Sequence, residues 1–377
     1  MITVQRQRTL YRDERFHAAF PSIVRFSDDA LLLAFRRARS GLWLISRQRR
    51  DALENQRRMD HMDCRSQLLL MELDGDGHPN GAALDGVPID PEAADQDPSL
   101  IVLPEDQVLL LSFSWYPLPS DVSGEFVGRE PPGERELGCR YLPWGSHSSL
   151  RARDAGRWLA HHRYLDPGGG PGGLLGAERQ RRYVGPIRGR PAMVDDEVLV
   201  AAYGQVLGGC ELYASRDAGG SWQWRGTIAT NVADETAFQE PALCEDGNGG
   251  LICFMRTAGA GGRLATCRSS DGVKWDQVRL HEVYGQPFHP LPLADGRILL
   301  CYGFRGKPYG VRVRLLEHAL AEPALAQEVV LRADGLGPDL GYPWAVQLRD
   351  GRVLVVYYWT DADGVRSIQG CWLKLAA

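Results

Sequence analysis

One pattern occurs six times in the chain: a residue followed by proline, then an apolar run, a short turn and a second apolar run. The residues that precede proline in the six copies are Phe20, Asp97, Arg190, Glu240, Gln286 and Tyr342. Proline lacks the N–H donor that a central strand needs, so it is suited to the first residue of a strand. Dipeptides between the two runs, such as Asp295-Gly296 and Asp350-Gly351, are typical of tight hairpin turns. The pattern therefore predicts six antiparallel sheets built from short strands.

The spacing of the copies limits how six sheets can be arranged. They recur at roughly 50 residues, within the range of repeat lengths that indicates a propeller or another array. One such sheet cannot bury both of its faces alone, whereas six sheets arranged in a ring cover one another. We therefore predict an all-β fold, a six-bladed β-propeller in which residues 1–377 form a single domain. Two β-sandwiches are the alternative, but sandwiches require no common repeat.

Two further features favour the propeller. Residues 367–374 form a candidate strand that could pair with residues 2–4 and close the ring. The turn Ser-Arg-Asp-Ala-Gly-Gly-Ser-Trp at residues 215–222 is an Asp-box, and residues 270–275 form a copy that is two residues shorter. In such a box the Asp accepts hydrogen bonds from backbone amides, the Gly allows a positive φ, and the Trp packs between sheets. We interpret the boxes as structural elements without a catalytic role.

Two regions interrupt the repeat. An Arg-rich insertion at about residues 38–65 lies between strands of the first blade, and a Pro- and Gly-rich insertion spans about residues 116–186. Long loops on a rigid repeat scaffold often carry binding function. For residues 166–182 a surface excursion without function is an equally good interpretation.

Charge and hydropathy exclude several classes of partner. A net charge of −5 offers no basic surface for nucleic acid or for an anionic membrane. No run approaches the ~20 apolar residues that a bilayer span requires. The N-terminus lacks the apolar core of a signal peptide, so we expect a cytoplasmic protein. Nothing in the sequence predicts the oligomeric state.

The cysteine and histidine patterns do not indicate a metal site. The eight cysteines are scattered and include no C-x-x-C pair, so we interpret them as reduced core residues. Four histidines fall into no ligand spacing, and we expect each to be a surface or loop residue: His61, His161, His162 and His289. We therefore predict neither a metal nor a cofactor.

The innermost strands of a propeller surround its central axis, so residues at the starts of these strands converge. Five of the six residues that precede proline are polar or have a polar tip. The arginines expected nearby are Arg36, Arg37, Arg188, Arg256 and Arg305. The planar guanidinium of Arg can bind a carboxylate through two parallel hydrogen bonds. We therefore predict an anionic small-molecule ligand, a carboxylated sugar first of all.

The Asp-boxes, the six proline-led strands and the spacing from Glu240 to Arg256 together resemble the sialidase (neuraminidase) superfamily over nearly the whole chain. The resemblance implies a retaining, exo-acting glycoside hydrolase that releases terminal sialic acids. Such enzymes use a Tyr nucleophile assisted by a Glu, an Asp acid/base, and three arginines on the substrate carboxylate. The resemblance implies that Tyr342 is the nucleophile and that Glu240 takes its proton. Arg256 and Arg305 would be two of the carboxylate arginines.

The same resemblance extends to residues around this centre. Asp97 matches the residue that contacts the N-acyl side of the sugar. Arg37 matches a further site arginine, with Arg36 as its rival because the strand register is open. We expect Arg190 and Gln286, which precede proline in their own repeats, to bind substrate as well.

The general acid/base has to come from a loop that reaches over the site. We place it at Asp63, near the end of the first insertion, with Asp60 as the second candidate and His61 as a modulator. Exposed loop acids without a catalytic role are the alternative interpretation of both aspartates.

One position departs from the family pattern. Sialidases begin the first blade with Arg-Ile-Pro, whose Arg is the first of the three carboxylate arginines, whereas this chain has Ala19-Phe20-Pro21. Loss of one charge-assisted partner would weaken carboxylate binding by ~1.5–3 kcal/mol, about one to two powers of ten. Three hypotheses therefore stay open. The chain is a hydrolase for sialic acid or a related acidic sugar, a hydrolase of the same fold for a different and even uncharged sugar, or a glycan-binding propeller without catalysis.

Overall fold

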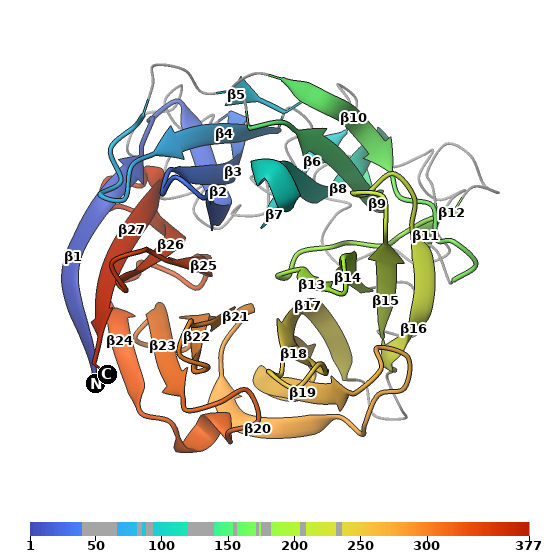
Figure 1. Cartoon of the computed structure of the whole chain (residues 1–377). Helices are drawn as coiled ribbons and strands as arrows, with labels where there is room; N and C mark the ends of the chain where they lie inside the picture. The colour runs from blue at the N-terminus through green and yellow to red at the C-terminus, as the bar shows by residue number, and fades with distance from the viewer. Residues whose placement is uncertain are drawn as a thin grey trace.

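Six β-sheets surround a central axis in the computed structural model of the chain (Figure 1). The structure describes residues 1–39, 66–80, 85–87, 93–119, 139–153, 157–170, 173–174, 182–203, 209–230 and 236–376. Much of the two predicted insertions lies outside these ranges. The prediction of an all-β, six-bladed propeller is confirmed.

Each blade is an antiparallel sheet whose first strand lies nearest the axis. Blade one contains β2 (Phe16–Arg25), β3 (Leu31–Arg39), β4 (Gln67–Leu73) and β5 (Asp85–Gly86). Blade two contains β6 (Ala94–Asp95), β7 (Ser99–Val102), β8 (Val108–Pro119), β9 (Cys139–Arg151) and β10 (Trp158–Tyr164). Blade three contains β13 (Ala192–Val194), β14 (Glu197–Tyr203), β15 (Cys210–Ser215) and β16 (Gln223–Ala229).

The second half of the ring is built in the same way. Blade four contains β17 (Ala237–Glu245), β18 (Leu251–Ala258), β19 (Arg263–Ser269) and β20 (Arg279–Tyr284). Blade five contains β21 (Phe288–Pro292), β22 (Ile298–Phe304), β23 (Gly310–Leu316) and β24 (Glu328–Arg332). Blade six contains β25 (Gly341–Gln347), β26 (Val353–Thr360), β27 (Arg366–Leu375) and β1 (Ile2–Tyr11). Outside the blades are the short pair β11 (Gly173–Leu174) and β12 (Arg182–Tyr183) and the 3₁₀ turns η3 (Pro104–Asp106) and η5 (Pro323–Leu325).

Blade six joins the two ends of the chain. The N-terminal strand β1 pairs antiparallel with β27, with Ile2 opposite Leu375 and Thr3 opposite Lys374. The two ends therefore lie side by side at the outer edge of the ring (Figure 1). The predicted closure of the ring is confirmed, because β1 completes the last sheet and is followed in the chain by β2 of the first sheet.

The core lies between neighbouring blades. Phe35 of blade one and Trp372 of blade six, for example, belong to one buried apolar cluster at the junction of these two blades. Six described cysteines are free and buried, as predicted: Cys210, Cys244, Cys253, Cys267, Cys301 and Cys371. The position predicted for His289 is wrong, because this residue lies in β21, is only 3% exposed, and packs against Trp344 with 4.5 Å between the ring centroids.

The turn at residues 215–222 has the hydrogen bonds expected of an Asp-box. The carboxylate of Asp217 accepts from the Ser221 amide and from the Ser221 hydroxyl, each at 2.8 Å. Gly219 follows with a φ of 84°. Trp222 is buried in the apolar cluster between blades two and three, where it belongs with Leu109. The turn therefore fixes the outer part of blade three against its neighbour.

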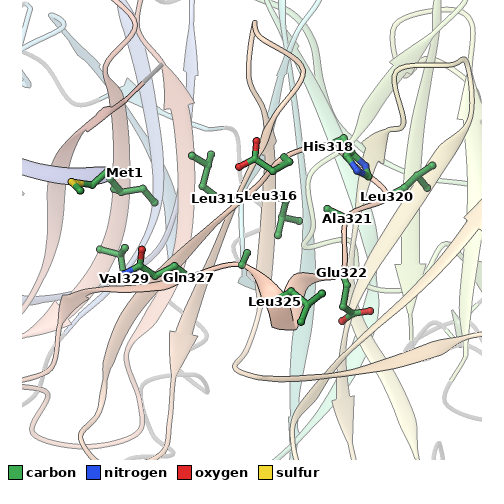
Figure 2. Close-up of a pocket in the computed structure, with 13 residues that line it drawn as sticks. Met1, Leu315, Leu316, His318, Leu320, Ala321, Glu322, Leu325, Gln327 and Val329 are labelled. Carbon is green, nitrogen blue, oxygen red and sulfur yellow. The ribbon is translucent and has the colours of Figure 1, made fainter.

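A groove of about 610 Å³ lies at the outer edge of blade five (Figure 2). Its walls come from the end of β23, from η5 and from Met1, and they include Leu316, Leu320 and Leu325. None of the predicted site residues that the structure describes lines this groove. No helix in the described part of the chain is both long and apolar enough to cross a membrane.

Candidate active site

Three inner strands carry the same irregularity at the residue before proline. Phe20 in β2, Glu240 in β17 and Tyr342 in β25 have φ values of 54°, 50° and 46°. In each strand the pairing register with the next strand shifts at this residue. A positive φ in a residue other than glycine costs roughly 1–3 kcal/mol, and such strain is concentrated at functional sites. The bulges therefore mark the same place in three blades.

Two of these strained residues meet across the ring. The Tyr342 hydroxyl donates a hydrogen bond to Glu240 Oε1 at 2.5 Å, although the residues belong to blades six and four. Both side chains are buried, with Tyr342 6% exposed and Glu240 4% exposed. Arg256 on β18 donates from Nη1 to the other carboxylate oxygen, Glu240 Oε2, at 3.1 Å. The register places Gln239 opposite Arg256, which explains how this arginine reaches Glu240.

The surroundings set opposite protonation states for the two partners. Burial alone would raise the pKa of Glu240, but Arg256, the hydrogen bond from Tyr342, Arg305 and Arg188 hold that pKa below its usual value. Burial, reinforced by the Glu240 charge, raises the pKa of Tyr342. At neutral pH the site therefore contains an ionised carboxylate that accepts from a protonated phenol. This is the arrangement of a base poised to take a proton from a nucleophile.

Two more guanidinium groups flank the Tyr342 ring. Arg305 Cζ lies 5.3 Å from the ring centroid, and Arg188 Cζ lies 5.2 Å from it. Among the residues that the structure describes, Arg305 forms no ion pair. Arg188 is paired with Asp97, with 3.4 Å between Nε and Oδ2. Arg305 is therefore the guanidinium best placed to bind an incoming anion.

The two candidate arginines of blade one have different surroundings. Arg36 is fully buried, its Nε donates to the Asp95 carbonyl at 3.2 Å, and it lies opposite Ala19 in the β2–β3 pair. Arg37 lies over the Phe16 ring, 4.0 Å from its centroid, and its Nη1 is 3.5 Å from the Tyr11 hydroxyl. Arg37 is thus anchored beside the outer strand β1. The structure does not bring it together with Tyr342 and Glu240 through any described contact.

The remaining predicted site residues do not all contact the site around Tyr342 and Glu240. Asp97 is buried and joins the site through Arg188. Arg190 instead donates to the Leu243 carbonyl and to Glu245 Oε2, each at 3.1 Å, further along β17 than Glu240. Gln286 is half-buried, and its backbone N–H donates to the Gly303 carbonyl at 2.8 Å. The predicted acid/base candidates Asp63 and Asp60, with His61, lie outside the described residues.

Two aromatic neighbours of the site were not among the predicted site residues. Phe20 packs edge-on against the Tyr342 ring with 4.8 Å between centroids. Tyr358 lies 5.8 Å from the same ring and donates its hydroxyl to Asp339 Oδ1 at 2.6 Å. Phe20 could have been found from its place before proline, which it shares with Glu240 and Tyr342. Tyr358 carries no comparable signal, because it is one of several aromatic residues in β26.

Comparisons with known proteins bear on the fold. No model of a known protein family matches the chain, and a search of curated proteins gives no match. The NanB sialidase from Streptococcus pneumoniae superposes with a TM-score of 0.67 at 12% identity, covering 98% of this chain and 70% of the other. The Hadza microbial sialidase Hz136 superposes with a TM-score of 0.60 at 14% identity, covering 95% and 66%. The fold is thus that of a sialidase-like six-bladed β-propeller.

Another solved structure has a higher TM-score and sequence identity to this chain and shows the family to which the chain belongs. It is a protein of unknown function from Dyadobacter fermentans, which superposes with a TM-score of 0.84 at 30% identity over 100% of this chain and 99% of the other. The chain belongs to the same family of sialidase-like propellers as this bacterial protein.

Proposed function

We propose that the chain is a retaining, exo-acting glycoside hydrolase of the sialidase type, which releases a terminal sialic acid or a related acidic sugar. The observation that carries the proposal is the 2.5 Å hydrogen bond from Tyr342 to Glu240, with Arg256 on the other carboxylate oxygen. A tyrosine nucleophile is one of the known exceptions to the two-carboxylate rule of glycosidases. A neutral phenol avoids the repulsion that a carboxylate nucleophile would exert on a carboxylated sugar.

The first step forms a bond between the Tyr342 oxygen and the anomeric carbon. The phenol proton passes to Glu240, and the glycosidic bond breaks as the leaving oxygen takes a proton from the general acid, for which Asp63 is the candidate. In the second step water attacks the anomeric carbon and loses a proton to that same acid/base group. The Tyr342 oxygen leaves and recovers its proton from Glu240. Two displacements at one carbon give retention of configuration.

Charge supports an acidic sugar as the substrate. Arg256 and Arg305 both lie beside the phenol and its base, and within the described part of the site Arg305 has no carboxylate partner. A desolvated guanidinium of this kind is suited to a carboxylate, which it binds through two parallel hydrogen bonds.

A second candidate function is a hydrolase of the same fold for a different sugar. Ala19 favours it, because the sequence resemblance matches this buried residue to the first carboxylate arginine of sialidases. Arg36, directly opposite Ala19, donates to the Asp95 carbonyl and is held there. Only one of these two functions requires a carboxylate on the substrate.

The test compares Tyr342→Phe and Glu240→Gln with Tyr302→Phe on a panel of acidic and neutral aryl glycosides. Tyr302 is a matched control, because this buried phenol donates to Glu328 Oε2 at 2.6 Å in blade five, and Arg314 Nε donates to it at 2.9 Å. We expect turnover of an aryl α-sialoside to fall by at least about 10²–10⁴-fold in both site variants and to persist in the control. NMR of the first product should show the retained anomer.

Three outcomes separate the hypotheses. Wild-type turnover of neutral glycosides alone would favour the second function. Full activity of Tyr342→Phe on a substrate that the wild type hydrolyses would show that the phenol takes no part in the reaction. Binding on a glycan array without any product from any glycoside would instead identify a glycan-binding propeller.

A further inference from the structure

Arg188 is a buried arginine in the segment before β13, and it connects three blades. It precedes the first strand of blade three and pairs with Asp97 of blade two, with 3.4 Å between Nε and Oδ2. Its Nη2 donates to the backbone carbonyl of Tyr342 in blade six at 3.3 Å. Only 2% of the residue is exposed. Burial of a charge costs several kcal/mol unless it is paired and hydrogen-bonded, and Asp97 and the Tyr342 carbonyl supply these two partners.

The same guanidinium faces two aromatic rings of β25. Its Cζ lies 5.2 Å from the Tyr342 centroid and 5.4 Å from the Trp344 centroid. Both distances are within the reach of a cation–π interaction. Arg188 therefore contacts Tyr342 in two ways, since it holds the backbone carbonyl and also places a positive charge beside the ring.

Gly189, the residue after Arg188, packs against the strand that carries the base Glu240. The backbone of Gly189 packs so tightly on blade four that a Cβ atom there would lie 1.8 Å from the carbonyl oxygen of Pro241, the residue after Glu240. The Gly189 carbonyl also accepts from the Ser99 hydroxyl at 2.9 Å. The two-residue segment 188–189 thus touches the strands that carry both Tyr342 and Glu240.

We propose that Arg188 is a positioning residue of the hydrolase, which fixes the left-handed Tyr342 backbone and favours the phenolate that develops when Glu240 takes the proton. This inference rests on the proposed function for its chemistry. The hydrogen bond to the carbonyl opposes relaxation of the strained φ of 46°. The positive charge beside the ring lowers the energy of the ionised phenol relative to the neutral one. Asp97 holds the guanidinium in place and offsets part of its charge.

The test uses a readout that does not require turnover. Trifluorotyrosine, whose phenol is intrinsically more acidic, is incorporated at position 342, and its ionisation is followed by ¹⁹F NMR as the pH is raised. Arg188→Gln, Arg188→Lys and Asp97→Asn are compared with Arg332→Gln. Arg332 is a matched control, because its Cζ lies 4.0 Å from the Trp359 centroid and it pairs with Asp334 at 2.5 Å on the outer strand of blade five.

We expect the midpoint of the phenol titration to rise by about one pH unit in Arg188→Gln and to fall in Asp97→Asn. Arg188→Lys loses the planar guanidinium but keeps the positive charge. The midpoint of its phenol titration should therefore stay near that of the wild type. In enzymes with natural Tyr342, kcat should fall by about tenfold to a hundredfold in both Arg188 variants, with KM little changed. Arg332→Gln should change neither quantity.

A midpoint that stays unchanged in both Arg188→Gln and Asp97→Asn would overturn the inference, and Asp97→Asn suffices if Arg188→Gln does not fold. So would a loss confined to KM. Shifted midpoints in a protein that hydrolyses no glycoside would support the role of Arg188 beside Tyr342 and overturn the proposed function. The two failures are therefore distinguishable.

Discussion

Tyr342 and Glu240 are 102 positions apart in the sequence, and the Tyr342 hydroxyl donates to the Glu240 carboxylate at 2.5 Å in the interior of the ring. The two residues lie on the inner strands of blades six and four, and blade five stands between them in the ring. Their hydrogen bond therefore depends on how three blades pack. Each residue also precedes a proline and has a positive φ, so both strands are strained at the positions that bring these side chains together.

Arg256 should set the acid limit of activity. Glu240 has to be ionised to accept the phenol proton, and Arg256 is the first of the groups that lower its pKa against the effect of burial. In the wild type we expect kcat/KM to decline only as the pH falls below the ordinary Glu value of about 4.3. In Arg256→Gln burial dominates, so the acid limb should move to higher pH by about 1–3 units.

The measurement for Arg256 is the pH dependence of kcat/KM, with Arg263→Gln as the control. Arg263 is a partly exposed arginine on the neighbouring strand β19, and it pairs with Glu282 at 3.1 Å at the surface. An acid limb that keeps its place in Arg256→Gln would mean that Glu240 is not the group that limits activity at low pH.

Arg305 should govern the affinity for acidic substrates. Its guanidinium lies beside the Tyr342 ring and, among described residues, has no carboxylate partner. Arg305→Gln should raise KM for an aryl sialoside by about 10–150-fold, which corresponds to the loss of ~1.5–3 kcal/mol from one charge-assisted interaction. Turnover of any neutral aryl glycoside should change little. An equal loss on acidic and neutral substrates would assign Arg305 a structural role instead.

The sequence was sufficient to predict the ring. Proline was predicted at the first residue of each strand, and this placement is wrong in three blades, where the proline lies at a bulge inside the inner strand: Pro21, Pro241 and Pro343. At a bulge, as at the start of a strand, proline does not have to donate a ladder hydrogen bond, so the repeat is still visible without coordinates. The pairing of Glu240 with Tyr342 was implied by the resemblance to sialidases, and their equivalent positions before proline placed both near the axis. A pattern that repeats in every blade can be read from the sequence because all six blades pack in the same way.

The side chains that surround this pair could not be predicted equally well. A bulge shifts the register by one residue and thereby changes which side chains share a face, so the choice between Arg36 and Arg37 was open in the sequence. Arg188 was expected near the axis, but its ion pair with Asp97 and its hydrogen bond to Tyr342 were not predicted, because these partners belong to other blades. Contacts of this kind depend on the ring as a whole and leave no local pattern.

Gly189 should tolerate no side chain. A Cβ atom there would lie 1.8 Å from the Pro241 carbonyl oxygen, which is backbone and cannot turn aside. We expect Gly189→Ala to lower the free energy of unfolding by about 1–3 kcal/mol and to reduce kcat as well, since Pro241 directly follows Glu240. Gly75→Ala is the control, because a Cβ at that position meets nothing within 4 Å. Denaturant unfolding and turnover are measured on both; a stable Gly189→Ala variant with full activity would contradict the close approach.

Asp217 should matter for stability and not for turnover. Its carboxylate accepts from the Ser221 amide and hydroxyl and from the Ser215 hydroxyl, each at 2.8 Å, at the outer edge of blade three. Partial burial alone would raise the pKa of Asp217, but these hydrogen bonds outweigh it and hold the pKa below its usual value. We expect Asp217→Ala to lower the free energy of unfolding at neutral pH by about 1–2 kcal/mol, with kcat unchanged.

The lowered pKa of Asp217 also predicts how the effect of Asp217→Ala on the free energy of unfolding changes with pH. A carboxylate whose pKa is lower in the folded than in the unfolded protein stabilises the fold fully above the unfolded value of about 3.9, and this stabilisation is lost as the pH falls through the folded value. The difference between wild type and Asp217→Ala should therefore be constant from neutral pH down to about pH 5 and shrink below about pH 4. Asp276→Ala, which removes an exposed carboxylate near the shorter box, should show no comparable difference. Thermal unfolding across this range measures both variants. A difference that stays constant down to about pH 2 would show that the Asp217 charge does not stabilise the turn.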